Sequence, residues 1–163
     1  MKTVPLTKGK FAMVDDEDFD EVSRHNWTFD PICDGKAKRK EGGKTILMHR
    51  QIMNCPDDLD IDHKNRDGLD NRKDNLRFCS QSMNMANTKK RSNARTSSYK
   101  GVCWYPKYNK WCAVLGFRKK RHFLGYFINE IEAAQAYDNK AREKFGEFAR
   151  LNFPKENERG CLV

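Results

Sequence analysis

Four polar positions near the middle of the chain constrain its fold more than any other feature. They are Asp62, His63, Asn75 and Asn84, so the two asparagines stand twelve and twenty-one residues after the histidine. Short apolar stretches separated by turn residues surround these positions, and such stretches are typical of strands. We therefore expect, in chain order, a helix over 48–54, a strand over 59–63, a loop, a second strand over 76–79 and a helix from Ser80 to about Asn87.

The residue types at these positions suit one kind of chemistry. They supply a carboxylate for a metal ion, a general base, an orienting amide and a second oxygen ligand, which are the parts that one-metal phosphodiester hydrolysis needs. His63 can accept a proton from water because the ordinary pKa of histidine is near neutrality. The alternative is an Asx-rich turn without chemistry, since Asn and Asp favour turns. His49 and Asn71, which stand in register with the four, favour the nuclease site.

Residues 47–87 resemble the HNH endonucleases, specifically the asparagine-ended branch found among phage and intron-associated homing endonucleases. The resemblance implies a ββα-metal fold, with Asp62 and His63 on the first strand and Asn84 on the helix that faces it. It also implies that Asp62 and Asn84 hold the metal ion. His63 would be the general base, and Asn75 would steady the loop and orient that base.

Many enzymes of that family have a histidine where this chain has Asn84. Two oxygen ligands make a hard site, which suits Mg²⁺ or Mn²⁺ better than Zn²⁺. Two further polar residues are less specific. Asn71 is expected to pin the loop, whereas His49 either contacts a phosphate near the site or only caps or packs its own helix.

The basic charge of the chain is concentrated in one stretch. The net charge is +9, and residues 88–123 contain eleven Lys or Arg and no Asp or Glu. A solvated surface normally carries charges of both signs. A stretch that carries only positive charges is more typical of a surface that follows a phosphate backbone. Within it, residues 88–97 form either a simple flexible linker or a basic arm that lies along the duplex.

The six cysteines form no C-x-x-C pair and no signal peptide is evident, so neither structural zinc nor a disulfide framework is expected. No apolar run approaches the roughly 18 residues of a membrane span. We therefore expect an intracellular protein with reduced cysteines, located in the cytoplasm of a bacterial host if a phage encodes it.

Residues 1–43 are expected to support the nuclease module. Strands are predicted over 11–14 and 27–29, with a helix between them that Asp15 or Asp16 caps. The acidic cluster over 15–21 would repel DNA, so this section is not expected to bind it.

Residues 98–154 carry a second set of motifs. The pieces are Lys100-Gly101-Val102, Lys110-Trp111-Cys112-Ala113, Leu124-Gly125-Tyr126-Phe127, Glu132-Ala133-Ala134, Ala136-Tyr137-Asp138 and Leu151-Asn152-Phe153. They resemble the DNA-binding domain of the plant APETALA2 and ethylene-response family, which also occurs fused to phage HNH nucleases. The residue pattern independently predicts three strands and a helix over 130–145, with Asn129 and Gly146 as its caps. The side chains expected to face the sheet from this helix are Ile131, Ala134, Tyr137, Ala141 and Phe145.

That family reads the major groove with one face of its sheet, a geometry that the groove admits. Carried over position by position, the candidate DNA contacts are Lys100, Trp104, Lys110, Trp111, Arg118, Lys120 and Arg121. Trp111 could equally belong to the core. Cys103, Val114 and Gly116 depart from the family's pattern, so its recognition sequence is not transferred.

The sequence thus predicts an α+β protein, in which a ββα-metal nuclease module precedes a three-stranded antiparallel sheet packed on one helix. The expected divisions are supporting residues 1–43, nuclease module 44–87, basic linker 88–97, DNA-binding domain 98–154 and tail 155–163. The expected function is a metal-dependent homing-type endonuclease that nicks double-stranded DNA as a monomer. The alternatives are a non-catalytic DNA-binding regulator, and a binder of structured RNA, for which no motif with stacked aromatics is present.

Overall fold

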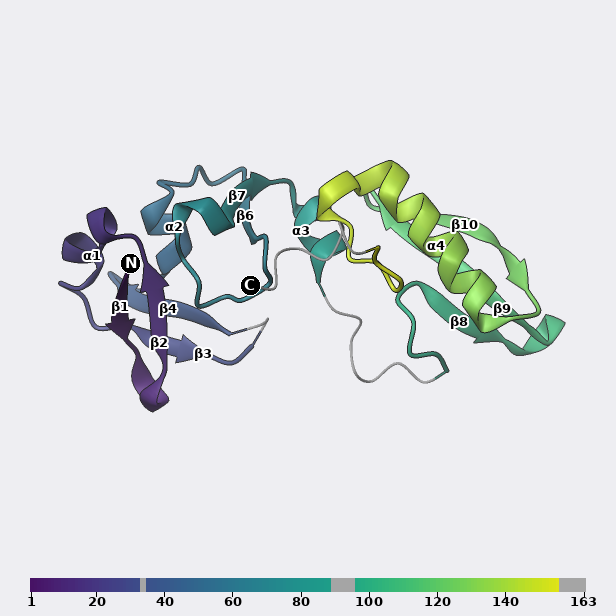
Figure 1. The fold of residues 1–163 in the computed structure, drawn as a ribbon, viewed down its shortest axis with the longest axis horizontal. Coiled ribbons are helices and arrows are strands. Elements are labelled where there is room, and N and C mark those ends of the chain that lie inside the picture. The colour runs from purple at the N-terminus through teal and green to yellow at the C-terminus, as the bar shows by residue number, and fades with distance from the viewer. Residues whose placement is uncertain (33–34, 89–95, 156–163) are drawn as a thin grey trace. The chain divides into compact units, whose positions relative to one another are not determined.

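The computed structural model describes residues 1–32, 35–88 and 96–155, and these form two compact units (Figure 1). The first unit is Met1–Ser80 and the second is Gln81–Val163. The division falls inside the range 44–87 that was expected to form the nuclease module. Most of the expected linker and tail lies outside the described residues.

The first unit is a set of small antiparallel sheets with two short helices. Its elements are β1 (Lys2–Pro5), β2 (Phe11–Val14), α1 (Asp16–Val22), β3 (Thr28–Asp30), β4 (Lys36–Glu41), β5 (Lys44–Leu47), α2 (Met48–Ile52), β6 (Asp60–His63) and β7 (Leu76–Cys79). The sheets are β1-β2, β3-β4-β5 and β6-β7. One apolar cluster joins most of these elements, and its buried members are Val4, Leu6, Ala12, Val14, Val22, Trp27, Ala37 and Met48.

The expected strand over 11–14 and the helix after it are confirmed, because alternation and acidic residues near a helix start are local signals. One detail differs. Asp15 stands at the N-cap position of α1, but its side chain makes no capping hydrogen bond there. Its carboxylate binds a distant backbone N–H instead, as described below.

The helix α2 is shorter than expected, because it ends at Ile52 and Asn54 adopts a positive φ of 43°. The Arg50 guanidinium then donates to the carbonyl oxygens of Pro56 and Leu59, at 2.7 and 2.8 Å. These bonds stabilise the segment that leads into β6, which begins at Asp60.

The second unit is a three-stranded antiparallel sheet covered by one long helix, as expected. Its elements are α3 (Gln81–Asn87), β8 (Val102–Tyr105), β9 (Lys110–Phe117), β10 (Lys120–Phe127) and α4 (Glu130–Phe145), with strand order β10-β9-β8. Asn129 caps α4 by accepting from the Ile131 N–H at 2.8 Å. Gly146 ends the helix with a φ of +53°, a conformation that glycine adopts without steric cost.

The apolar stripe of α4 differs from the expectation at one residue. Ala134, Tyr137, Ala141 and Phe145 are buried, but Ile131 is 46% exposed. Ala133 is fully buried as well, so the side of α4 that meets the sheet is rotated away from Ile131. The small alanine side chains let the helix lie close to the strands.

The described cysteines are free thiols, namely Cys55, Cys79, Cys103 and Cys112. Within residues 1–32, 35–88 and 96–155, no helix is long and apolar enough to cross a membrane.

Candidate active site

The strand pair β6-β7 carries the two most informative polar residues. Asp62 and His63 are 4% and 5% exposed and stand opposite Arg77 and Leu76 in the antiparallel register. The Oδ2 atom of Asp62 accepts from Nε and Nη2 of Arg77, at 2.9 and 2.8 Å. The guanidinium therefore compensates the charge of this buried carboxylate. Sequence alone does not predict the role of Arg77, because its place opposite Asp62 follows only from the strand register.

The environment of His63 favours a neutral imidazole. Burial lowers the pKa of His63 below its ordinary value, and the positive charge of Lys36 lowers it further, whereas Asn71, Asp62 and Asp67 oppose the shift. A neutral ring at neutral pH is the form that a general base requires.

His49 packs against His63. The two imidazole rings meet edge to face, with 5.0 Å between their centroids, and His49 is 2% exposed. Burial, with the neighbouring charges of His63, Lys36 and Arg50, lowers the pKa of His49 to about 2. Of the two roles left open by the sequence, this geometry favours packing, because a neutral buried ring offers no charge to a phosphate.

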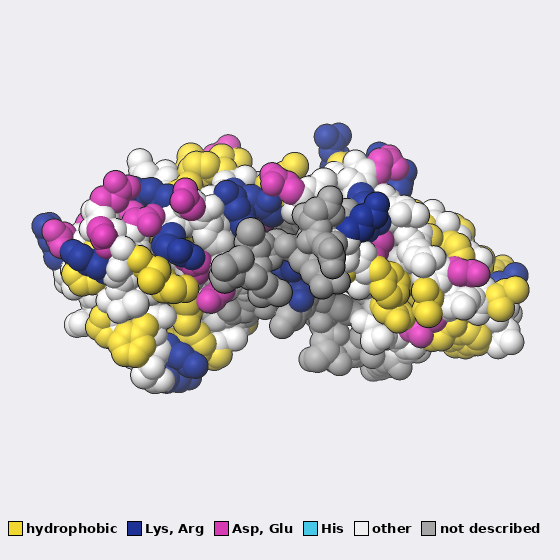
Figure 2. All heavy atoms as spheres, in the orientation of Figure 1, with side chains coloured by type: hydrophobic (Ala, Val, Ile, Leu, Met, Phe, Trp, Pro, Cys, Tyr) yellow, Lys and Arg dark blue, Asp and Glu magenta, His cyan; other side chains and the backbone are white. Residues whose placement is uncertain are grey.

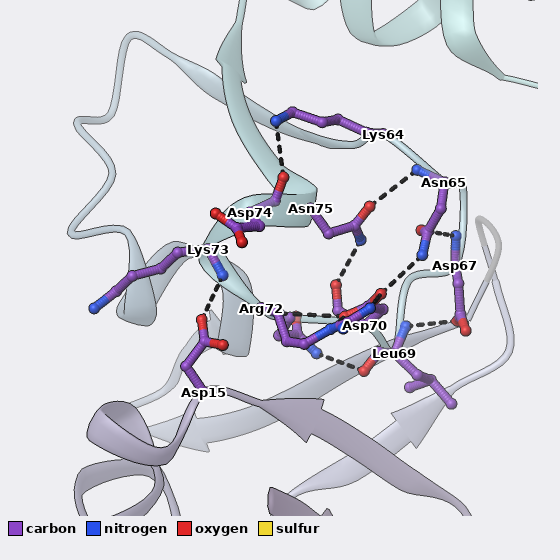
Figure 3. A network of polar contacts seen from close by, with 11 residues as sticks. Asp15, Lys64, Asn65, Asp67, Leu69, Asp70, Arg72, Lys73, Asp74 and Asn75 are labelled. Carbon is purple, nitrogen blue, oxygen red and sulfur yellow. Dashed lines mark hydrogen bonds and ion pairs between the residues drawn. The ribbon is translucent and has the colours of Figure 1, made fainter. Parts of the chain in front are cut away.

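The loop between β6 and β7 is held by the side chain of Asn75 (Figure 3). Its Oδ1 accepts from the Asn65 N–H at 3.0 Å, and its Nδ2 donates to the Asp70 carbonyl oxygen at 2.8 Å. The Lys64 N–H also donates to the Asn75 carbonyl oxygen, at 2.9 Å. Asn75 thus closes the loop across its base, directly after the strand that ends in His63.

A second group of hydrogen bonds in the loop is made by the Asp70 carboxylate, which is fully buried. Arg72 donates to both of its oxygens, at 2.7 Å each, and the Asn65 side chain donates to Oδ2 at 2.8 Å (Figure 3). These bonds lower the pKa of Asp70, with the Arg72 side chain as the largest cause. Sequence patterns gave no reason to single out this aspartate among its neighbours.

The N-terminal strand β2 supplies backbone hydrogen bonds to the same loop. The Met13 N–H donates to the Leu69 carbonyl oxygen, and the Asn71 N–H donates to the Met13 carbonyl oxygen, at 2.8 Å each. The Asp15 carboxylate accepts from the Lys73 N–H at 2.8 Å. Met13 and Asp15 therefore help to hold the loop between β6 and β7.

Acidic side chains of α1 extend this support. Lys73 forms ion pairs with Glu17 and Asp18, at 2.5 and 3.0 Å. On the face of the first unit drawn in Figure 2, acidic side chains gather over the region where Figure 1 places α1.

The remaining expected ligand, Asn84, lies on α3 in the second unit and is half-buried. Within the described parts of the chain, no group of three His, Cys, Asp or Glu side chains could hold a metal ion. The expected ligand pair has one carboxylate and one amide, both hard oxygen donors of the kind that Mg²⁺ accepts.

The structure divides the candidate DNA contacts into two groups. Trp104 and Trp111 pack edge to face, with centroids 5.1 Å apart, and Trp111 packs against the core between sheet and helix. The Lys100 ammonium donates to backbone carbonyl oxygens at the end of α3. The candidates with exposed side chains are Lys110, Arg118, Lys120 and Arg121.

Comparison with known proteins identifies the class to which these features belong. A model of the HNH endonuclease family matches residues 54–86. An uncharacterised HNH endonuclease of Acanthamoeba polyphaga mimivirus is 30% identical over 151 residues, which cover 89% of this chain and 76% of the viral protein. The chain therefore belongs to the HNH endonuclease family of DNA nucleases.

A second similarity concerns a plant protein. Dehydration-responsive element-binding protein 2E of Arabidopsis thaliana is 51% identical over 39 residues, which are 24% of this chain and 16% of the plant protein. This short match agrees with the resemblance to plant DNA-binding domains, and it covers a small part of either protein.

We predict that Asn75→Ala loosens the active-site loop. The substitution leaves the Asn65 N–H and the Asp70 carbonyl oxygen without their partner, and each such loss costs about 1–3 kcal/mol. Hydrogen exchange should increase over residues 64–75, and the melting temperature should fall. Asp74→Ala, at the exposed neighbouring position, is the control. Equal exchange in both variants would contradict this role of Asn75.

Proposed function

We propose that the chain is a metal-dependent endonuclease that hydrolyses a phosphodiester of double-stranded DNA. The observation that carries this proposal is a buried His63, held neutral by its surroundings, next to a carboxylate that Arg77 keeps charge-compensated. A base and an anionic ligand side by side match the needs of hydrolysis, because one removes a proton and the other attracts a cation.

In this proposal His63 takes the proton of the attacking water at a ring nitrogen. Packing of His49 against the ring restricts its orientation, and Asn75 fixes the loop that begins beside it. Asp62 and Asn84 would hold Mg²⁺ or Mn²⁺, which supplies charge relief at the scissile phosphate and the departing oxygen. Magnesium commonly keeps few protein ligands and fills its remaining positions with water and phosphate, so two oxygen donors suffice.

The second unit would hold the DNA. The candidate DNA contacts with exposed basic side chains lie on β9, on β10 and in the turn between these strands, namely Lys110, Arg118, Lys120 and Arg121. Positive side chains on a sheet that fits the major groove suit contacts to both phosphates and base edges. A nuclease motif and a groove-binding surface in one chain suit a homing-type enzyme with an asymmetric target.

We predict that His63→Ala abolishes most cleavage but preserves DNA affinity, since the base acts after binding. Loss of a general base typically reduces the rate by roughly 10²- to 10⁴-fold. Single-turnover cleavage and a gel-shift titration, at equal protein concentration, would measure the two effects. His25→Ala, outside the β6-β7 site, serves as the control. Turnover close to wild type would rule out His63 as the base.

Metal dependence has its own test. Cleavage by the wild type should require Mg²⁺ and stop on addition of EDTA. Asp62→Ala and Asn84→Ala should each abolish the Mg²⁺-dependent reaction, because each removes one of two protein ligands. Activity that survives exhaustive chelation would contradict one-metal chemistry and leave family membership unaffected.

We further expect a monomer that cuts one strand at a time. One base and one metal address one scissile phosphate, and the two strands of a duplex present phosphates of opposite polarity. Supercoiled plasmid should become open circular first, with linear product late or only at high enzyme concentration. Direct formation of linear product, together with a dimeric mass in solution, would overturn the nicking mode.

A further inference from the structure

Four aromatic rings gather on one face of the second unit and form an exposed patch. They belong to Tyr105, Tyr108, Phe123 and Tyr126, and each side chain is between 37% and 57% exposed. Tyr126 contacts the other three, with ring centroids 5.3, 4.9 and 4.8 Å from those of Tyr105, Tyr108 and Phe123. Single exposed apolar residues are ordinary, whereas a contiguous patch of them marks an interaction site.

The pleat of β8 and β9 shows which face of the sheet carries this patch. Val102 and Ala113 are register partners and pack with alanines of α4 in one apolar cluster, so they lie on the face that the helix covers. Successive side chains of a strand point to opposite faces. Tyr105 of β8, with Cys112 and Val114 of β9, therefore lies on the face away from α4.

A β-bulge adds the two rings of β10 to the same face. Phe123 stands opposite Val114, and Tyr126 stands opposite Cys112. Residues three positions apart point to opposite faces in a regular strand. Here the register shifts between Phe123 and Gly125, and Gly125 has a φ of +137°, which glycine adopts readily. The shift brings both rings onto the face of the aromatic patch.

Positive charges lie at the ends of this face. Lys110 is the first residue of β9, and Arg121 stands opposite Gly116 near the other end of that strand. The Lys107 ammonium, in the turn before β9, lies 5.6 Å from the centroid of the Tyr108 ring. An apolar centre between positive ends suits DNA, because phosphates border the groove in which the base edges lie.

The residue types of the sheet limit which bases it can read. Strands β8, β9 and β10, which the structure describes throughout, contain no Asp, Glu, Asn or Gln. In the major groove, Asn and Gln pair with adenine, Asp and Glu with cytosine, and Lys and Arg with guanine. The centre of the patch offers apolar contact instead. The C5 methyl group of thymine is the apolar group that unmodified base pairs present in this groove.

The packing of the rings favours a duplex over a single strand. The Tyr108 and Tyr126 rings meet at 83°, and the other ring pairs in the patch are tilted by 42–59°. Each ring therefore covers part of a neighbour. Stacking of an unpaired base needs an open ring face. Contact with a methyl group does not, so the patch fits the edge of a base pair better.

We propose that the aromatic patch contacts thymine methyl groups in the major groove, and that the chain therefore prefers A·T-rich duplex DNA. The four rings are then specificity-determining residues, while Lys110 and Arg121 hold the phosphates on either side. The tyrosine hydroxyls can bond to the O4 and N7 acceptors of the same base pairs. This inference rests on the proposed DNA-binding role of the second unit.

A selection followed by the exchange of one chemical group tests the inference. The full chain, kept in EDTA to prevent cleavage, enriches binders from a pool of random-sequence duplexes. The enriched duplex is then made with deoxyuridine in place of thymidine, which removes only the C5 methyl groups. We expect enrichment of A·T-rich duplexes. Each lost methyl contact should weaken binding about 4-fold, which corresponds to the burial of one methylene-sized group.

Phe123→Ala is the matching variant, because Phe123 is the most exposed of the four rings and its loss leaves the core intact. The affinity ratio between the thymidine and deoxyuridine duplexes should fall about 4-fold. Ile128→Ala removes another exposed apolar side chain, outside the patch, and should retain the wild-type ratio. Lys110→Met should weaken binding to both duplexes equally and reduce the salt slope by about 1.

Equal affinity of the wild type for both duplexes, or enrichment of G·C-rich duplexes, would overturn the inference and leave the DNA-binding role in place. Tighter binding to the corresponding single strand would overturn it in favour of base stacking. An unchanged ratio in Phe123→Ala would also overturn it and leave the patch to a protein partner. Absence of binding to every duplex would instead contradict the proposed DNA-binding role itself.

Discussion

The Asp70 carboxylate is buried completely within the loop that follows His63, and it is ion-paired to Arg72 and hydrogen-bonded to Asn65. A buried charge is tolerated only where its partners satisfy it, so the loop has one arrangement in which this group is stable. The backbone on either side of Asp70 is bonded to Asn75 and to β2. The conformation of the loop that follows His63 is therefore fixed by hydrogen bonds of its own side chains.

A comparable arrangement recurs in the second unit. There Asp138 is the buried carboxylate, and Asn152 relays its hydrogen bonds to the segment before β8. In both units an aspartate accepts bonds from an asparagine, which can donate and accept at once. Such pairs fix irregular backbone where the regular bonding of helices and sheets ends.

Much of the local structure could be predicted from sequence. The limits of β2, β7 and α4 were anticipated because alternation, turn residues and caps act within a few residues. Ile131 was assigned to the wrong side of α4, since periodicity alone does not say where a buried stripe is centred. The residues of the β6-β7 hairpin could be predicted from their chemistry, and the structure brings His63 and His49 together.

The partners of those residues could not be predicted. Arg77 reaches Asp62 only through the strand register, and Asp15 reaches the Lys73 N–H across 58 positions of sequence. Lys100 belongs to a basic stretch, and the resemblance to the plant DNA-binding domains predicted that it contacts DNA. Its ammonium instead donates to carbonyl oxygens at the C-terminal end of α3. This contact depends on the folded backbone, so sequence alone does not predict it.

The hydrogen bonds between β2 and the loop that follows β6 determine how much of the chain must be moved together if the motif is transferred to another protein. The segment that matches the HNH family model, residues 54–86, contains His63 and the loop but neither Met13 nor Asp15. If this segment were transferred to another protein, it would keep the motif residues but lose the hydrogen bonds that β2 makes with the loop. A segment that keeps these hydrogen bonds has to include β2 as well as residues 54–86. Recombination at a point between β2 and residue 54 would separate the motif from the strand that holds its loop.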